Sequence, residues 1–234
     1  MISDKNQRII IVAGGKGVRV GGDCPKQFQL LSGKPMLMHT IQAFFDYNHR
    51  MDIIVVLPFG FDVHWKELCE IYGFDIPHTI VIGGETRFHS VKNGLAEVAE
   101  NDIVGVHDGA RPLVTRLLIE RCFAAAAAQQ CGIVPVVDEP NSVRVVTETG
   151  SSVMDRSTLK IVQTPQVFPA AILKKAYETE FNPMFTDDAS VVEQKGFRIA
   201  LVPGEETNIK ITSAFDLRIA EIYLQSGEKN HDFT

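Results

Sequence analysis

The chain has 234 residues, of which 45% are hydrophobic and 22% are charged, and its formal net charge at pH 7 is −6. This length suits one α/β domain, with or without a sizeable insertion, and the apolar fraction is sufficient for a packed core, which argues against an intrinsically disordered chain. The acidic balance argues against a general nucleic-acid binder, whose binding surface would be basic.

Five short apolar runs rich in valine and isoleucine recur along the first part of the chain, and turn residues bound each of them. They comprise residues 8–13, 53–58, 79–83, 103–107 and 132–137. Continuous rather than alternating hydrophobicity is typical of strands that are buried on both faces of a parallel sheet. We therefore predict five buried, parallel strands.

The segments between these runs are long enough for crossover helices. They comprise residues 35–46, 61–72, 90–98 and 115–129. Pro35 suits a first helical position, Thr115 an N-cap and Gly73 the position just after a helix. Strands that alternate with helices predict an α/β fold with a doubly wound, mostly parallel sheet.

The alternation of strands and helices ends after Val137. Residues 138–163 contain the alternating run SVRVV and the turn-forming run TETGSS, and no long helix separates them. This pattern predicts a β-hairpin that forms a protruding arm. Beyond it we expect two helices and one strand, at residues 168–178, 187–196 and 198–202.

The C-terminal part of the chain carries helix start signals. Thr212 or Ser213 is expected to cap a last helix that ends near Tyr223, with Asp216 near its third position. The polar residues 225–234 are expected to form a flexible tail. The whole chain, residues 1–234, is expected to form one domain that includes the arm and this tail.

The cysteines and the apolar runs also limit the class of protein. The four cysteines form no C-x-x-C pair, which argues against a zinc knuckle or a redox pair. The sequence opens without a charged and then apolar leader, and its longest apolar run is far short of the roughly 18 residues of a membrane span. We therefore expect a cytoplasmic protein with reduced thiols and no membrane partner.

A glycine-rich and cationic loop, AGGKGVRVGGDCPKQF, follows the first predicted strand directly. Glycine lets backbone N–H groups approach a ligand, and lysine and arginine match phosphate charge, so an anion is the expected occupant. Two familiar phosphate loops do not fit. The dinucleotide fingerprint needs a glycine where Val20 stands, and the P-loop needs Ser or Thr where Gly17 follows Lys16. The alternative is a glycine-rich turn with solvated charges.

Further glycines and charged residues follow the third and fourth predicted strands, in the segments GGETRFHS and HDGARP. Ligands bind beyond the carboxyl ends of parallel strands, so these segments and the glycine-rich loop are expected to meet. Cations, glycine-exposed N–H groups and the carboxylate of Asp108 together suit a polyphosphate with a divalent metal ion. Structural roles are the alternatives: a turn at residues 83–84, a loop cap at Asp108 and a buried imidazole at His107.

Six segments resemble, in the same order, those of the 2-C-methyl-D-erythritol 4-phosphate cytidylyltransferase family. They are AGGKGVR with PKQF, GGETRFHSV, HDGARP, DRSTLKIVQTPQVF, TDDAS and NIKIT. The resemblance covers nearly the whole chain, residues 8–224. The resemblance implies a Rossmann-like nucleotidyltransferase of the non-mevalonate isoprenoid pathway. Such an enzyme transfers CMP from CTP to 2-C-methyl-D-erythritol 4-phosphate, with Mg²⁺, and releases pyrophosphate. It also implies a homodimer in which the arms interlock.

The resemblance assigns roles to individual residues. The nucleotide would be bound by Ala13, Gly14, Gly15, Gly17, Gly84, Glu85, Arg87, Ser90 and Gly109. Arg19 and Lys26 would stabilise the pentavalent phosphorus, and Asp108 would hold the metal ion. Arg156 and Lys210 would also be catalytic, and Arg156 is expected to reach the site of the other subunit. The second substrate would be bound by Arg111, Ser142, Arg156, Thr186 and Lys210.

The sequence departs from the family pattern at four places. The first motif begins A-G-G where many members have A-A-G, Glu85 stands in place of a common Asp, and Val20 in place of Met. An extra EPN precedes Ser142, so that Ser142 is matched to the usual Thr of the arm across an insertion.

Two other functions remain open from the sequence. A ribitol-5-phosphate cytidylyltransferase shares the glycine-rich loop, PKQF and TPQ, but DR at 155–156, HDGARP and TDDAS favour the methylerythritol enzyme. A non-catalytic nucleotide-sensing domain would keep the nucleotide segments and lose a charged group such as Lys26 or Asp108, and both are present.

Overall fold

The computed structural model describes residues 6–14 and 25–226. Gly15, Gly17, Arg19 and the tail beyond Ser226 therefore lie outside the described residues, and their expected roles stay predictions. None of the helices within the described ranges is long and apolar enough to cross a bilayer.

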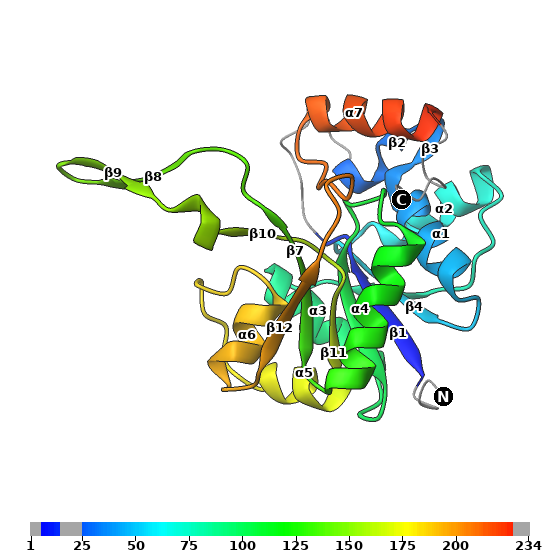
Figure 1. Cartoon of the computed structure of the whole chain (residues 1–234). Helices are drawn as coiled ribbons and strands as arrows, with labels where there is room; N and C mark the ends of the chain where they lie inside the picture. The colour runs from blue at the N-terminus through cyan, green and yellow to red at the C-terminus, as the bar shows by residue number, and fades with distance from the viewer. Residues whose placement is uncertain (1–5, 15–24, 227–234) are drawn as a thin grey trace.

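Among the described residues, eight strands form one sheet at the centre of the molecule (Figure 1). The strands are β1 (Gln7–Val12), β4 (Asp52–Leu57), β5 (Thr79–Ile82), β6 (Ile103–Asp108), β7 (Gly132–Asp138), β10 (Lys160–Val162), β11 (Gln166–Pro169) and β12 (Ile199–Pro203). β1 lies between β4 and β6 and is parallel to both, β4 is parallel to β5, and β7 is parallel to β12. The predicted mostly parallel α/β sheet is confirmed.

Two strands of the sheet were not predicted: β11, and β10, whose residues were expected to belong to the arm. β11 lies between β6 and β7 and is antiparallel to both, so these two parallel strands do not pair with each other. The expected helix at 168–178 begins later than predicted, because Phe168 and Pro169 belong to β11 and the helix α5 spans Ala170–Ala176. The neighbouring short strand β10 is also antiparallel to β7 and closes the arm onto the sheet.

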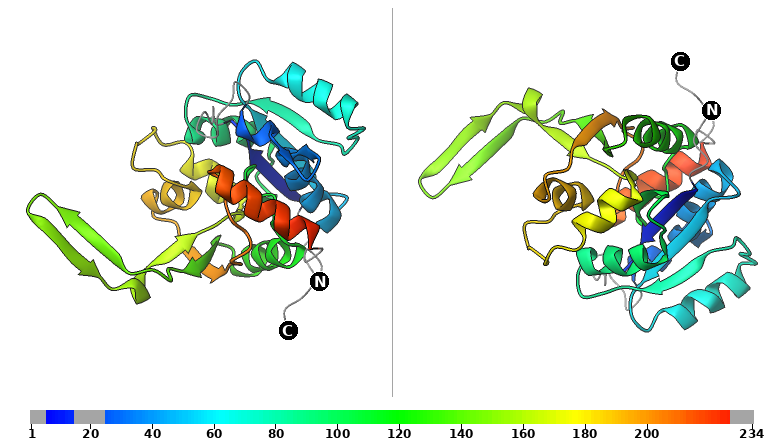
Figure 2. Two further views of the ribbon diagram at one scale, coloured as in Figure 1. Left: turned by 90° about the horizontal axis from the view of Figure 1, so that it is seen from above. Right: turned by 90° about the horizontal axis from the view of Figure 1, so that it is seen from below.

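Helices cover both faces of the sheet, as continuous apolar strands require (Figure 2). On one face, α1 (Met36–Tyr47), α2 (Asp62–Ile71) and α4 (Arg116–Gln129) pack in a core that includes Ile9 and Ile11. On the other, α3 (Arg87–Gly94), α5 and α6 (Asp188–Gln194) pack in a core that includes Ile10. Successive residues of β1 thus face opposite cores, as the two-residue period of a strand dictates.

Several helix boundaries follow from capping. Thr115 caps α4 by accepting a hydrogen bond from the Leu118 amide, as predicted. Ser213 and Asp216 cap α7 (Ala214–Gln225) reciprocally, so Ser213 rather than Thr212 is the cap. α3 begins three residues earlier than predicted, because Thr86 caps it.

Two further boundary predictions have different outcomes. Gly73 has φ +58° just after α2, the left-handed conformation expected of a glycine that ends a helix. Pro35 is the N-cap residue of α1 rather than its first residue, because it still pairs in the short ribbon of β2 (Leu30–Leu31) and β3 (Lys34–Pro35).

The predicted arm is a two-stranded ribbon that projects away from the body of the molecule (Figure 1). β8 (Val143–Thr147) pairs only with β9 (Gly150–Met154) in the described part of the chain, in a sheet of its own. Almost all of its residues are exposed, including Val146 at 81% and Val153 at 75%. The arm therefore has no core of its own.

A buried aromatic cluster holds the turn that carries Lys26. Phe28 packs against Phe61, His64 and Trp65, with ring centroids 5.6–5.9 Å apart. Trp65 is fully buried. These contacts anchor the 3₁₀ turn Lys26–Phe28 to the start of α2.

The imidazole of His78 is held neutral beside Trp65. Trp65 Nε1 donates a hydrogen bond to His78 Nε2 (2.8 Å), and His78 Nδ1 donates to the Ile76 carbonyl (2.7 Å). Burial lowers the pKa of His78 below its ordinary value of 6.5, although the bond to Ile76 opposes this shift. Protonation of Nε2 would remove the acceptor of the tryptophan N–H.

We expect Trp65, the single tryptophan of the chain, to report this protonation. Its fluorescence should titrate with a midpoint below pH 6.5 and lose this titration in His78→Gln. Because the unfolded chain takes up the proton first, the stability that neutral His78 contributes is complete above pH 6.5 and is lost as the pH falls through the folded pKa. Urea unfolding at a series of pH values measures this loss. His64→Gln is the control, and a titration that survives in His78→Gln contradicts the assignment.

Candidate active site

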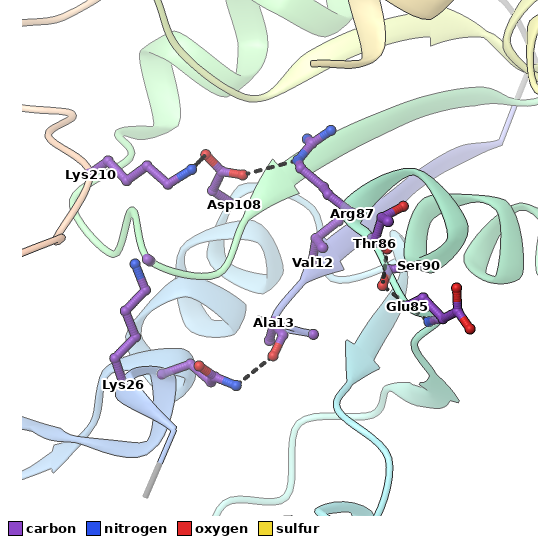
Figure 3. Close-up of a pocket in the computed structure, with 13 residues that line it drawn as sticks. Val12, Ala13, Lys26, Glu85, Thr86, Arg87, Ser90, Asp108 and Lys210 are labelled. Atoms are coloured by element: carbon purple, nitrogen blue, oxygen red, sulfur yellow. Dashed lines mark hydrogen bonds and ion pairs between the residues drawn. The ribbon is translucent and has the colours of Figure 1, made fainter. Parts of the chain in front are cut away.

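A cavity of about 530 Å³ opens at the carboxyl ends of β1 and β6 (Figure 3). Its walls come from the end of β1, the turn of Lys26, the start of α3 and the segment around Lys210. The lining residues are Val12, Ala13, Gly14, Lys26, Gln27, Gly84, Glu85, Thr86, Arg87, Ser90, Asp108, Ala110 and Lys210. The predicted meeting of the glycine-rich loop with the two strand-end segments is thus confirmed for the described residues.

The end of β1 is held from two sides. The Ala13 carbonyl accepts a hydrogen bond from the buried side chain of Gln27 (2.5 Å), and the Gly109 amide donates to the Val12 carbonyl (2.9 Å). A Cβ at Gly109 would lie 3.2 Å from Ala13 Cβ, which is closer than an ordinary van der Waals contact. A glycine therefore suits this position, where the loop after β6 passes the end of β1. Gly109 does not itself line the cavity, so its expected contact with the nucleotide stays a prediction.

The N-terminus of α3 forms the opposite wall. Ser90 Oγ accepts from the Gly84 amide (3.2 Å) and donates to the Thr86 carbonyl (2.9 Å), which fixes the turn between β5 and α3. A Cβ at Gly84 would lie only 2.4 Å from His89 Cβ, so no other residue fits this turn without a shift. Glu85 lies at the rim of the cavity (Figure 3).

The carboxylate of Asp108 is the centre of charge in the cavity. Lys210 Nζ lies 2.9 Å and Arg111 Nε 3.5 Å from its Oδ2, and Arg87 Nε lies 3.5 Å from its Oδ1. Burial by itself would raise the pKa of this carboxyl, but Arg87, Lys210 and Arg111 hold it well below its usual range. Asp108 is therefore ionised at neutral pH.

Lys26 and Lys210 enter the cavity from different elements (Figure 3). Lys26 Nζ donates to the carbonyl of Ile211 (3.0 Å), the residue after Lys210. Ile211 in turn donates its amide to the Ala110 carbonyl (2.8 Å). Two lysines far apart in the sequence thus lie at one cavity, as the sequence analysis predicted.

A second cavity of about 210 Å³ adjoins the first. The side chains that line both are Arg87, Asp108 and Lys210, and the predicted residues Arg111 and Thr186 line only the smaller one. Arg111 is buried and donates to the carbonyls of Asn208 (2.8 Å) and Val162 (3.3 Å). The grouping of Arg111, Thr186 and Lys210 at one place agrees with their expected common ligand.

The guanidinium of Arg87 is more constrained than the sequence predicts. Its terminal nitrogens make a bidentate pair with Asp188, at 2.9 and 2.7 Å, and its Nε faces Asp108. The Nε edge of the guanidinium therefore faces Asp108, whereas the fork formed by its two terminal nitrogens faces Asp188.

The two arm residues that the resemblance placed at the substrate do not reach either cavity of their own chain. Ser142 and Arg156 are both exposed, and Arg156 donates a hydrogen bond to the Pro140 carbonyl within the arm. Figure 1 shows why: the arm leaves the body of the molecule and turns back only at β10.

Sequence reasoning missed several residues of the site. Gln27 and Asp188 stand inside the quoted segments PKQF and TDDAS, yet nothing in their residue type indicated that they tie other groups in place. Thr86 lines the cavity and caps α3, and its position before the apolar face of α3 is a capping signal. No sequence pattern pointed to Thr164, because its contacts with Asp108 and His107 depend on the pairing of β11, a strand that was not predicted.

A buried hydrogen-bond chain fixes the loop that follows β6. The Asp108 amide donates to Thr164 Oγ1 (3.1 Å), whose hydroxyl donates to His107 Nδ1 (3.0 Å). His107 Nε2 donates to the Arg111 carbonyl (3.1 Å). Burial lowers the pKa of His107 to about 4, so this side chain is a neutral structural imidazole.

The residues present limit how a metal ion could be held. In residues 6–14 and 25–226, no group of three or more His, Cys, Asp or Glu side chains could hold a metal ion. Among the residues that the structure describes, Asp108 is the single carboxylate that lines both cavities. Mg²⁺ commonly takes one or two protein carboxylates together with substrate phosphates, and one carboxylate at a cavity lined by lysine and arginine fits that pattern.

Comparisons with known proteins agree on one family. A family model described as IspD: 2-C-methyl-D-erythritol 4-phosphate cytidylyltransferase matches residues 8–226. Proteins named 2-C-methyl-D-erythritol 4-phosphate cytidylyltransferase from Phocaeicola vulgatus and Bacteroides fragilis are 53% and 54% identical to this chain. The matches cover 94% and 92% of this chain, and 100% and 98% of theirs.

Solved structures give the same result. The crystal structure of 2-C-methyl-D-erythritol 4-phosphate cytidylyltransferase from Thermus thermophilus matches with a TM-score of 0.75 and 30% identity, over 94% of this chain and 99% of that one. The crystal structure of 4-diphosphocytidyl-2C-methyl-D-erythritol synthase from Anaerococcus prevotii matches with a TM-score of 0.80 and 26% identity, over 96% and 98% of the two chains.

The hydrogen-bond chain through Thr164 generates a stability prediction. Thr164→Val keeps the shape but leaves the buried Asp108 amide and His107 Nδ1 unpaired, so we expect the free energy of unfolding to fall by about 1–3 kcal/mol. Thr164→Ser keeps the hydroxyl and loses one methyl group, which costs about 0.8 kcal/mol. Urea denaturation measures both, and a valine variant as stable as the serine variant contradicts the role of the hydroxyl.

Proposed function

This chain belongs to the 2-C-methyl-D-erythritol 4-phosphate cytidylyltransferase family, and from that membership we propose how its residues act on the two substrates. It transfers the cytidylyl group of CTP to 2-C-methyl-D-erythritol 4-phosphate, giving 4-diphosphocytidyl-2-C-methyl-D-erythritol and pyrophosphate. The observation that carries the assignment of residues is the pair of adjoining cavities that share Arg87, Asp108 and Lys210.

CTP binds in the larger cavity. Its volume of about 530 Å³ is in the range of small-molecule sites, and its walls offer what a nucleoside triphosphate needs. The described part of the glycine-rich loop and the turn at Gly84 bring backbone close to the ligand, and Lys26 supplies positive charge. Arg19 stands in the same loop and is assigned with Lys26 to the charge that develops at the α-phosphorus.

The acceptor phosphate binds in the smaller cavity. Thr186, Arg111 and Lys210 line it, and a hydroxyl with two cations is a suitable set for a phosphate monoester. Lys210 and Asp108 also line the larger cavity, which supports an acceptor bound beside the triphosphate. Proximity of the two substrates is itself a large part of catalysis.

The reaction is a displacement at phosphorus without a covalent protein intermediate. An oxygen of the acceptor phosphate attacks the α-phosphorus of CTP, the new P–O bond forms, and the bond to pyrophosphate breaks. The acceptor phosphate is already largely ionised at neutral pH, since its second pKa is about 6, so no general base is required. Fixed cations stabilise the charge on the equatorial oxygens, which is the main contribution of the protein.

Asp108 is the residue that would hold a magnesium ion. Lys210 Nζ lies 2.9 Å from its Oδ2, whereas Arg87 Nε lies 3.5 Å from its Oδ1. Oδ1 is therefore the oxygen that is more accessible to an ion. When bound, the ion supplies positive charge to the phosphate oxygens. Arg87, Arg111 and Lys210 keep the carboxylate ionised and oriented.

The arm completes the site of a second copy in a cytoplasmic homodimer. A ribbon that exposes Val146 and Val153 and has no core of its own is marginally stable by itself, which supports a partner surface. Arg156 lies exposed at its base, outside the cavities of its own chain. Its planar guanidinium suits the acceptor phosphate in the partner's smaller cavity.

Substrate choice is tested by incubating the protein with CTP, Mg²⁺ and either 2-C-methyl-D-erythritol 4-phosphate or ribitol 5-phosphate, with pyrophosphate release as the readout. We expect turnover with the first and a kcat/KM lower by at least about 100-fold with the second. Both acceptors carry the phosphate that the smaller cavity binds, but a polyol of different length and branching should misplace the attacking oxygen, and a small misplacement can cost this factor. Preference for ribitol 5-phosphate, or CTP binding without any turnover, contradicts the function.

Site sharing is tested by mixing subunits. Lys26→Ala and Arg156→Ala proteins are mixed at an acceptor concentration at which neither turns over. One of the two sites of a heterodimer then has wild-type Lys26 together with wild-type Arg156 from the other arm, so up to about a quarter of wild-type activity should return if mixing is random.

The control mixes Lys26→Ala with Lys210→Ala. These residues line the cavity of the same chain, so each site of that heterodimer lacks one lysine and no activity should return. Recovery in both mixtures, or in neither although heterodimers form, overturns the shared site.

A further inference from the structure

The side chain of Arg87 lies between two carboxylates with different roles. It projects from the first residue of α3, and its Nε is 3.5 Å from Asp108 Oδ1. Both terminal nitrogens are instead directed at Asp188, with Nη1–Oδ1 2.9 Å and Nη2–Oδ2 2.7 Å. The fork of the guanidinium, its strongest recognition element for an anion, is thus turned away from Asp108.

Asp188 is built to hold that fork. Its side chain has no exposed surface, and Tyr177 Oη donates a third hydrogen bond to its Oδ1 (2.6 Å). Tyr177 is itself 2% exposed and stacks on Phe88, with ring centroids 4.7 Å apart. A fully buried carboxylate needs such complete pairing, and this pairing gives Arg87 one orientation.

The sheet sets the position of Asp188. The buried side chain of Gln166, on β11 beside β6, accepts from the Ala189 amide (2.9 Å) and donates to Asp187 Oδ2 (2.8 Å). Asp187 caps α6, and Asp188 is the first residue of that helix. The inserted strand therefore places the start of α6 opposite the start of α3.

We propose that Asp188 is a positioning residue, which keeps the fork of Arg87 off Asp108 and so leaves Asp108 Oδ1 available to the cavity. Without the charge of Asp188, the fork would turn to the nearest remaining carboxylate and pair with Asp108 in the bidentate geometry that arginine favours. Asp108 would then be covered on both oxygens, since Lys210 already takes Oδ2. The inference rests on the proposed function only in taking Asp108 as the carboxylate that meets the metal ion.

The test compares the affinity for CTP with and without Mg²⁺, by calorimetry in the absence of the acceptor, so that no turnover occurs. In Asp188→Asn we expect the gain in CTP affinity on adding Mg²⁺ to shrink at least about tenfold, as is typical when a partner of a metal ligand is lost. The Mg²⁺ concentration for half-maximal activity should rise by the same factor. Affinity for CTP without metal should change less than about threefold.

Asp102→Asn is the matched control. Asp102 is also a fully buried carboxylate that accepts from an arginine, Arg8 Nε at 2.5 Å, but it lies beyond the opposite end of β6. This variant should lower the melting temperature as Asp188→Asn does and leave the response to Mg²⁺ unchanged. If the two variants respond to Mg²⁺ alike, Asp188 is only a stabilising residue and the proposal is overturned.

The double variant Asp188→Asn with Arg87→Gln separates positioning from simple loss of charge. If the freed arginine blocks Asp108, removing the arginine as well should restore most of the Mg²⁺-dependent gain in CTP affinity. If the losses of Mg²⁺-dependent CTP affinity caused by the two single substitutions simply add in the double variant, the proposal is wrong. If Asp188→Asn fails to fold, Tyr177→Phe provides the test, because it removes one hydrogen bond to Asp188. We expect the Mg²⁺-dependent gain in CTP affinity to shrink by about two- to fivefold in this variant. An unchanged gain overturns the proposal.

The outcome for the wild type keeps the two hypotheses distinct. If the wild-type protein binds CTP with no dependence on Mg²⁺, the assignment of Asp108 in the proposed function is wrong. If the wild type responds to Mg²⁺ and Asp188→Asn responds equally, only the positioning role is wrong.

Discussion

The carboxylate of Asp108, held among three cations at the end of the central strand β6, is the interaction on which the rest of the site depends. A buried carboxylate is costly unless it is paired, and the three cations that contact Asp108 come from different parts of the chain. Arg87 comes from α3, Arg111 from the loop after β6, and Lys210 from the segment before α7. The result is one charged centre that joins the walls of both cavities.

Two of these three cations, Arg87 and Arg111, are in turn held by further contacts, which restrict how the centre can move. Arg87 is bound by Asp188, and Arg111 donates to the Asn208 and Val162 carbonyls. These contacts use groups on or beside β10, β11 and α6. The insertion of the antiparallel β11 between β6 and β7 is therefore the topological feature that provides the smaller cavity and separates this sheet from a simple doubly wound one.

The arm obeys a different constraint from the body. The body buries apolar side chains on both faces of its sheet, whereas β8 and β9 expose valines on a ribbon two strands wide. Such a ribbon gains little from burial within its own chain, and its exposed face is suited to contact with another protein surface. The same segment carries Arg156, which lies away from the cavities of its own chain.

The sequence by itself determined the parallel strands, the crossover helices, the arm and the segments that meet at the cavity. It could do so because buried strands, capped helices and turns leave local patterns, as at Thr115, Gly73 and Ser213, and because parallel strands all present their carboxyl ends at one edge. Its resemblance to one family also placed Lys26, Asp108 and Lys210 together. Tertiary structure alone decided the rest, because the pairing of β11 with β6 and the bonds from Asp188 to Arg87 and from Thr164 to Asp108 join residues at least 56 positions apart. Such contacts depend on which elements become neighbours in space, and no local pattern of polar or apolar residues records that.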